Sequence, residues 1–355
     1  MQLTPAQTVS RAAFNHVRRF AHILSALALI CLPVWFALSQ TQKDAKPQDK
    51  NSEIKLGVDL VVLDALVLQQ KTGRIIGNLK KDDFTLYEDG IKQQISHFSQ
   101  DKLPLSVILM VDRAGCLDAF GKQVRQATVD ALSKLKDEDE VAVMMFSDEV
   151  DLIQPFRYDK KRAIDALDQI PQQEDEDAGH CFNKAFYQAA KYMNEAANPA
   201  GRRVLIMITG ITTDFSCKGI SPDEVRNEIF ESGTVVCGLI PASAGQHLES
   251  GIIRGATGVG KAFGAHTASL SQLAEETGGE VMNDKAENLD KTFGTLVDHL
   301  RTRYSIGFIP TNPKRDGTFR KLKLDLPPSV DAKYGKVVVK TRRGYIAGKA
   351  AGSSK

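Results

Sequence analysis

A carboxylate, an imidazole and two thiols stand on predicted loops of this 355-residue chain, where they could hold a metal ion or form a covalent link. They are Asp112, Cys116, His180 and Cys181. Carboxylate oxygens favour hard cations such as Mg²⁺, whereas imidazole and thiolate favour Zn²⁺ or Cu⁺. Motifs of the H-E-x-x-H or G-x-S-x-G type are absent, so no nucleophile is paired with a base and the sequence predicts no catalysis.

Asp112 ends an apolar run of strand length, and similar runs recur along the chain. These runs are Leu105–Val111, Val141–Phe146, Val204–Ile208 and Thr234–Ile240. Amphipathic stretches of helical spacing separate them, and nearly continuous apolar strands are typical of a parallel sheet covered on both faces. Ligands bind such open sheets at the carboxyl ends of the strands, where Asp112 lies. We therefore expect a doubly wound α/β domain over residues 103–301.

Two segments of β pattern flank this domain. The first, residues 55–100, alternates apolar and polar residues around Asp89-Gly90, a dipeptide typical of tight hairpins. The second, residues 302–347, contains "YSIGFIP", "FRKLKLDL" and "KVVVKTRRGYIA". A few isolated strands cannot bury an apolar face alone, so we expect the two segments to form one β-sandwich, with the α/β domain inserted between them.

The amino-terminal segment predicts export. Three arginines precede an apolar run over residues 20–38, and the small residues Ala37 and Ser39 follow at the spacing of a cleavage site. Residues 1–39 are therefore a signal peptide or, if uncleaved, an anchor and the chain's one contact with a membrane. Residues 40–54 are a polar, flexible linker, and residues 348–355 a disordered tail. We expect a periplasmic, secreted or inner-membrane-anchored protein that faces outward.

The charge balance gives no support to nucleic-acid binding. The formal net charge is +2, and loss of the three leader arginines leaves 43 basic residues against 44 acidic ones. The acidic run QEDEDAG, residues 173–179, is either a solvated loop or a rim that faces a cation or a basic partner. The basic stretches "KRDGTFRKLK" and "KTRRG" are expected on the exposed faces of edge strands.

Five ordered stretches resemble the von Willebrand factor A family, and specifically its exported bacterial members in which β segments flank a related A domain. They are "DFTLYEDGIKQQISHF", "LSVILMVDRAG", "AEETGGEV", "LRTRYSIGFIP" and "RRGYIA". The resemblance covers about residues 55–346. It implies an A-type fold with an adhesion site at the end of the first strand, where Asp-x-Ser-x-Ser, a threonine and a later aspartate hold Mg²⁺ and a partner's acidic group completes the shell.

The candidate site departs from that family pattern. Asp112 matches the first aspartate, but Ala114 and Cys116 stand at the two serine positions. His180 stands at the threonine position, and Gly210 stands at the later aspartate position. Asp214 lies four residues further on. The resemblance therefore implies a degenerate metal site and no resident cofactor.

Two replacements for the metal remain open. A disulfide between Cys116 and Cys181 would link the loops that the ion ties together in the family, with Cys217 as the alternative partner. Alternatively, Asp112, Cys116, His180 and Cys181 bind a softer ion such as Zn²⁺. The remaining thiol, Cys237, lies within a strand and is expected in the core.

The favoured function is non-catalytic: an exported module that binds an extracytoplasmic protein, or mediates adhesion, through the top face of its sheet. We expect Asp112, Arg113, Cys116, His180 and Asp214 to form that face. A transition-metal-binding protein or metal-dependent enzyme is the second hypothesis, and a structural component of the cell envelope is the third. The fold alone does not choose among them.

Overall fold

The computed structural model describes residues 60–113, 121–168, 179–198, 201–210, 219–242 and 268–348. Their strands form one six-stranded sheet and two four-stranded sheets. None of the helices in these ranges is long and apolar enough to cross a membrane. The predicted leader, linker and tail lie outside the described residues.

The six-stranded sheet has the order β10-β9-β8-β5-β6-β7 and is parallel except for the edge strand β7. Its strands are β5 (Leu105–Asp112), β6 (Glu140–Phe146), β7 (Val150–Arg157), β8 (Arg202–Ile208), β9 (Val235–Ala242) and β10 (Val281–Lys285). The central strands are buried nearly throughout, as their continuous apolar character predicts.

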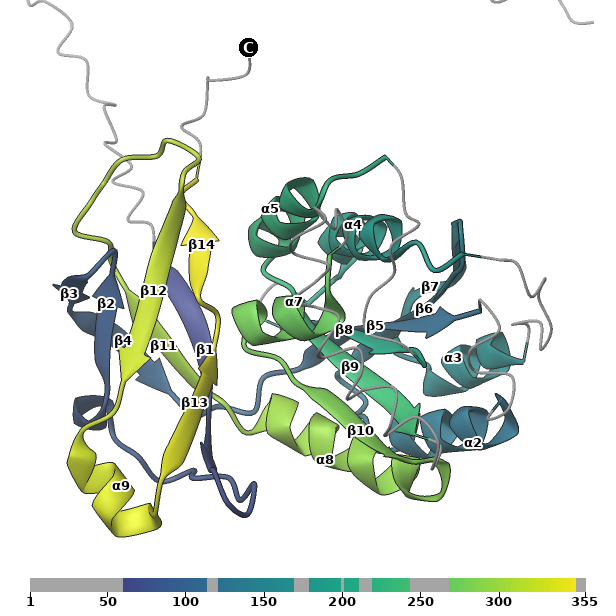
Figure 1. The fold of residues 1–355 in the computed structure, drawn as a ribbon, viewed down its shortest axis with the longest axis horizontal. Helices are drawn as coiled ribbons and strands as arrows, with labels where there is room; N and C mark the ends of the chain where they lie inside the picture. Colours follow the sequence, from purple (N-terminus) through teal and green to yellow (C-terminus); the bar gives the residue numbers. More distant parts are fainter. Residues whose placement is uncertain are drawn as a thin grey trace, which may run out of the picture. The chain divides into compact units, whose positions relative to one another are not determined.

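Helices cover both faces of this sheet (Figure 1). One face packs against α2 (Gly121–Leu132), α3 (Lys160–Leu167) and α8 (Leu289–Arg301). The other packs against α4 (Phe182–Tyr192), α5 (Pro222–Ser232) and α7 (Leu270–Thr277). The expected doubly wound α/β fold is confirmed.

The two four-stranded sheets form the expected β-sandwich, in which strands from both ends of the chain pair. One sheet has the order β13-β1-β11-β4, and the other has the order β14-β12-β2-β3. Their strands are β1 (Val61–Gln69), β2 (Thr85–Glu88), β3 (Ile91–Gln93), β4 (Ile95–Ser99), β11 (Tyr304–Phe308), β12 (Phe319–Asp325), β13 (Val337–Thr341) and β14 (Gly344–Ile346), with the short helix α9 (Pro328–Tyr334) before β13. Side chains from both sheets share one apolar core.

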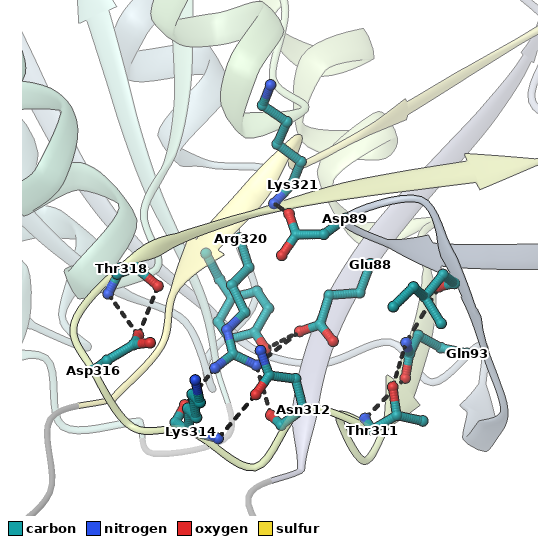
Figure 2. A network of polar contacts seen from close by, with 12 residues as sticks. Glu88, Asp89, Gln93, Thr311, Asn312, Lys314, Asp316, Thr318, Arg320 and Lys321 are labelled. Carbon is teal, nitrogen blue, oxygen red and sulfur yellow. Dashed lines mark hydrogen bonds and ion pairs between the residues drawn. The ribbon is translucent and has the colours of Figure 1, made fainter.

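Particular residues fix two connections of the sandwich, the turn between β2 and β3 and the loop between β11 and β12. Asp89 and Gly90 join β2 to β3 with φ values of 47° and 83°, so the predicted hairpin is confirmed and its turn needs the left-handed region that Gly adopts freely. On the neighbouring strand, Arg320 is buried; it donates to the carbonyls of Asn312 and Lys314 and pairs with Glu88 (Figure 2). These bonds pin the loop between β11 and β12 to the sandwich.

Partly buried ion pairs tie the sandwich to the α/β domain. Arg202 at the start of β8 lies 3.1 Å from the carboxylate of Asp64 on β1, and it also donates to the hydroxyl of Ser305 at 3.2 Å. Lys340 on β13 lies 3.2 Å from Glu280, which precedes β10. Because each pair joins one sheet of the sandwich to the central sheet, the α/β domain is an insertion held at a fixed seam.

Candidate functional site

Asp112 is the last residue of β5, at the carboxyl edge of the central sheet. Its side chain has no exposed surface, although the strand opens there into a loop. An ionised carboxylate without water needs hydrogen-bond donors around it, because an unpaired buried charge is strongly unfavourable. The structure supplies those donors from two other segments of the chain.

His180 is the first of these donors. Its Nδ1 atom lies 3.0 Å from each of the two carboxylate oxygens of Asp112. The imidazole is 17% exposed, so it covers the buried carboxylate and reaches the surface. His180 directly precedes Cys181, the N-cap residue of α4, so the start of that helix fixes the position of the ring.

Thr209 is the second donor. It follows β8, the strand beside β5, and its hydroxyl donates to the Oδ2 atom of Asp112 at 2.5 Å. Thr209 is fully buried, and its own backbone N–H bonds to the carbonyl of Leu239 on β9. The carboxylate of Asp112 therefore joins three segments at the edge of the sheet.

Backbone hydrogen bonds hold the same loops against β6. The N–H of Arg113 donates to the carbonyl of Phe146, and the N–H of Cys181 donates to the carbonyl of Ser147, each at 2.9 Å. The Arg113 guanidinium turns toward the sulfur of Met145 at 3.1 Å. The loops that carry Asp112 and His180 thus share the end of β6 as a common support.

Asn183 organises the neighbouring loops from within α4. The residue is fully buried, and its side-chain amide donates to the carbonyl of Ile220 at 2.7 Å and accepts from the N–H of Ala268 at 2.6 Å. Ile220 lies just before α5, and Ala268 lies just before α7. One side chain therefore fixes the entries of two helices on this face.

Cys181 takes part in a disulfide bond. Cys237 is a free thiol in the core, as expected, and burial raises its pKa to about 11. The two predicted partners, Cys116 and Cys217, lie outside the described residues, and so does Asp214. The pairing of Cys116 with Cys181 therefore stays a prediction.

A hard divalent cation fits this arrangement poorly. An imidazole nitrogen already lies against both oxygens of Asp112, so a metal ion there would have to displace His180. Within the described ranges, no three His, Cys, Asp or Glu side chains are grouped closely enough to hold a metal. The described side chains around Asp112 therefore form a hydrogen-bonded cluster that does not fit a hard metal ion.

Sequence reasoning found half of this cluster. The structure brings together Asp112 and His180, and it places Arg113 beside them at the end of β5. Thr209 and Asn183 were missed as site residues, although each has a sequence signal. Thr209 is a polar residue directly after an apolar strand, and Asn183 is an amide within the otherwise apolar face of its helix.

Comparison with known proteins supports the domain assignment. Residues 107–212 match the family model of the von Willebrand factor type A domain. The matched range begins within β5 and covers Asp112, His180 and Thr209. The resemblance stated from the sequence is thereby confirmed for the central domain. No curated protein matches the chain.

Several solved structures are similar at low identity. An aerotolerance-related membrane protein from Bacteroides fragilis NCTC 9343 is 12% identical with a TM-score of 0.40, and the match covers 55% of this chain and 98% of that one. BatB from Bacteroides thetaiotaomicron is 12% identical with a TM-score of 0.38, over 55% and 98% of the two chains. A von Willebrand factor type A protein from Catenulispora acidiphila is 10% identical with a TM-score of 0.41, over 75% of each chain. With TM-scores at this level, these likenesses carry no argument about function.

Proposed function

We propose that this chain, which carries a von Willebrand factor type A domain over residues 107–212, is an exported, non-catalytic module that binds a protein partner. The binding face is the carboxyl edge of the central sheet, around Asp112, Arg113 and His180. We place the protein outside the cytoplasm because of the charged and apolar pattern of residues 1–39.

One observation supports the proposal: the Nδ1 atom of His180 lies 3.0 Å from both oxygens of the Asp112 carboxylate. The imidazole thus lies against the carboxylate that faces a metal ion in the family. The partner would then meet an imidazole, and binding would not depend on a divalent cation.

A disulfide fits the same interpretation. A metal site holds its loops together, so a chain that has lost the metal needs another tie between the loops after β5 and before α4. We propose that the disulfide of Cys181 is formed with Cys116 and is that tie, closing a loop of about 65 residues that the chain-entropy model credits with about 4 kcal/mol. A sulfur in a disulfide is not a thiolate, which argues against Cys181 as a soft-metal ligand.

Site-specific photo-crosslinking in the native envelope tests the binding face. A photoreactive residue replaces Asp148, which is exposed beside Ser147 at the end of β6, and a control replaces Lys333, exposed on α9 of the sandwich. We expect a discrete cross-linked protein from position 148, none from position 333, and an unchanged yield after chelation. Replacing His180 with Ala is expected to reduce the yield from position 148.

Two outcomes would contradict the proposal. A yield that falls on chelation, together with a stoichiometric metal in the purified protein, would establish a metal-dependent site. The same cross-linked products from positions 148 and 333, unchanged by the loss of His180, would instead favour a structural envelope component. The carboxyl edge of its central sheet would then bind no partner.

A further inference from the structure

A groove with a volume of about 1100 Å³ lies between α7 and the sandwich. This is slightly more than the ~300–1,000 Å³ typical of small-molecule pockets. Its floor is the outer face of β12 and β2, and the exposed side of α7, with Ser271 and Glu275, forms the opposite wall. The groove is remote in the chain from Asp112 and His180, and none of the residues of that site lines it.

The floor of the groove is basic. Along β12, Leu322 and Leu324 are buried in the sandwich, so Lys321 and Lys323 project from the opposite face, as the period of two dictates. Figure 2 shows Lys321 pointing away from the polar network around Arg320. The register then places Tyr87 opposite Lys323, and Lys92 on β3 opposite Tyr87. Lys321 and Lys323 therefore line the groove beside Tyr87, whereas Lys92 is exposed on the neighbouring strand outside the groove lining.

The basic side chains of the groove form only exposed ion pairs with neighbouring acidic side chains. Lys323 pairs with Asp325 at 2.7 Å, but the two side chains are 73% and 41% exposed. Arg343, at the rim, pairs with Glu275 where both are more than half exposed. Exposed pairs of this kind contribute little to stability, so a ligand carboxylate can replace either acidic partner.

The walls, by contrast, are fixed. The guanidinium of Arg226 on α5 lies 4.3 Å from the ring centre of Phe319 on β12 and pairs with Glu276 on α7 at 2.7 Å. The backbone of Gly278 approaches Thr341 on β13 so closely that a Cβ atom at Gly278 would lie 2.6 Å from it. A preformed groove binds a flexible segment without the cost of ordering its own walls.

Two segments of the sequence carry four consecutive carboxylates, residues 137–140 and residues 174–177. In the first run Asp139 and Glu140 are buried, so residues 174–177 are the run whose chemistry matches this floor. An extended segment of four residues spans about 13 Å, the reach of two or three neighbouring lysines on a sheet face. Blocks of like charge of this kind commonly serve as interaction segments.

The topology separates the helix that leads into this segment from the groove. Residues 174–177 follow α3 in the chain, and α3 packs beside β6 and β7 at one edge of the central sheet, whereas the groove lies beyond β10 at the other edge. Five strand spacings of about 4.8 Å, roughly 24 Å, separate the two edge strands. The end of α3 and the groove of one molecule thus belong to opposite edges of the sheet.

We propose that the acidic run of one copy, residues 174–177, docks in the basic groove of a second copy, on Lys321 and Lys323. The contact is heterologous because the run and the groove are different parts of the chain, so association proceeds head to tail. The groove shares no residue with the partner site at Asp112, although the run ends three residues before His180.

Sedimentation velocity of the exported, processed chain tests the proposal. We expect the average mass to rise with protein concentration at about 0.05 M salt and to fall to that of a monomer at about 0.5 M salt, because exposed charges are screened. Reversing the groove (K321E with K323E) or the run (E174K with D175K) is expected to weaken association by about tenfold or more. The matched control, K71E with K81E, reverses two exposed lysines elsewhere in the sandwich and is expected to associate as the wild type does.

Mixing the two reversed proteins provides the decisive measurement. The intact run of the first fits the intact groove of the second, and the two reversed surfaces also match, so association is expected to return only in the mixture. A synthetic peptide of residues 171–179 is expected to compete with wild-type association, which checks the contact without any folded variant. A monomer at all concentrations, or association insensitive to both reversals and to the peptide, would overturn the proposal.

Discussion

The Nδ1 atom of His180 lies 3.0 Å from both oxygens of the Asp112 carboxylate, and one of these oxygens also accepts from Thr209. A buried carboxylate, a largely covered imidazole and a buried hydroxyl therefore form one cluster across two adjacent strand ends. The contribution of each side chain to the free energy of unfolding should therefore depend on the other two.

The pair formed by Asp112 and His180 is expected to be energetically coupled. Asp112→Ala leaves the imidazole and the Thr209 hydroxyl without their acceptor, so we expect a loss of about 2–4 kcal/mol of unfolding free energy. In a double-mutant cycle with His180→Ala, urea unfolding should show a coupling of about 1–3 kcal/mol. Additivity of the two single losses within about 0.5 kcal/mol would mean that the contact contributes nothing.

Thr209 is expected to stabilise the cluster through its hydroxyl alone. Thr209→Val keeps the branched shape but removes the donor to Asp112, and we expect a loss of about 1–2 kcal/mol. Thr209→Ser keeps the hydroxyl and serves as the control. If Thr209→Ser proves as destabilising as Thr209→Val in the same urea experiment, methyl packing rather than the hydrogen bond holds the site.

Asn183 is expected to order two helix entries together. Asn183→Leu leaves the buried N–H of Ala268 and the carbonyl of Ile220 unpaired, at a cost of about 2–4 kcal/mol for the two groups. Hydrogen exchange should quicken at the starts of both α5 and α7, whereas Lys184→Ala on the exposed side of the same helix should change neither. Faster exchange at one entry alone would argue against a shared anchor.

The cysteines are expected to respond unequally to alkylation. Because burial raises the pKa of Cys237 to about 11, its thiol should resist labelling in the native protein and react once the chain is unfolded. Peptide mapping without reduction should then find Cys181 joined to Cys116. Labelled Cys181 in the unreduced, unfolded sample would rule out the disulfide, and a Cys181–Cys217 peptide would correct the pairing.

Glu280 is expected to make the contact between the sandwich and the α/β domain less stable in acid. Burial acts to raise its pKa, but the hydrogen bond from His299 and the charge of Lys340 outweigh burial and hold the pKa below its ordinary value of 4.5. A lowered folded-state pKa means that this stabilisation is present above the unfolded pKa and is lost as the pH falls through the folded one.

Urea unfolding against pH measures this effect. Wild type should lose its stability advantage over Glu280→Gln as the pH falls from about 6 to about 3, while Glu231→Gln, at an exposed carboxylate, should run parallel to wild type. A difference between wild type and Glu280→Gln that stays constant over that range would show that ionisation of Glu280 does not stabilise the seam.

The architecture was largely predictable because its signals are periodic. Continuous apolar runs predicted the parallel strands, and Asp89-Gly90 predicted the tight hairpin between β2 and β3. The edge strand β7 was missed, since its alternation is interrupted at Pro155 and its residues are only partly buried. The short helix α9 was missed because seven residues carry too little periodicity to distinguish a helix from a loop.

The site was less predictable, because it depends on contacts between segments far apart in the chain. Family position identified Asp112 and His180 as neighbours, but no local pattern states that an imidazole binds both carboxylate oxygens. Thr209 stands beside Gly210, the position at which the family's later aspartate is missing, and its own hydroxyl bonds to Asp112. Asn183 acts through two backbone groups whose positions only the fold defines.

The pairing of β1 with β11 and β13 also has a consequence for the order in which the chain acquires structure. Strands β1 to β4 are made first, yet most of their partners follow the entire α/β insertion. Contacts of such long sequence separation form slowly, and open strand edges invite wrong pairing while they wait. A chain that crosses a membrane amino end first would therefore complete its sandwich last, and the carboxyl-terminal strands would act as the closing step of biogenesis.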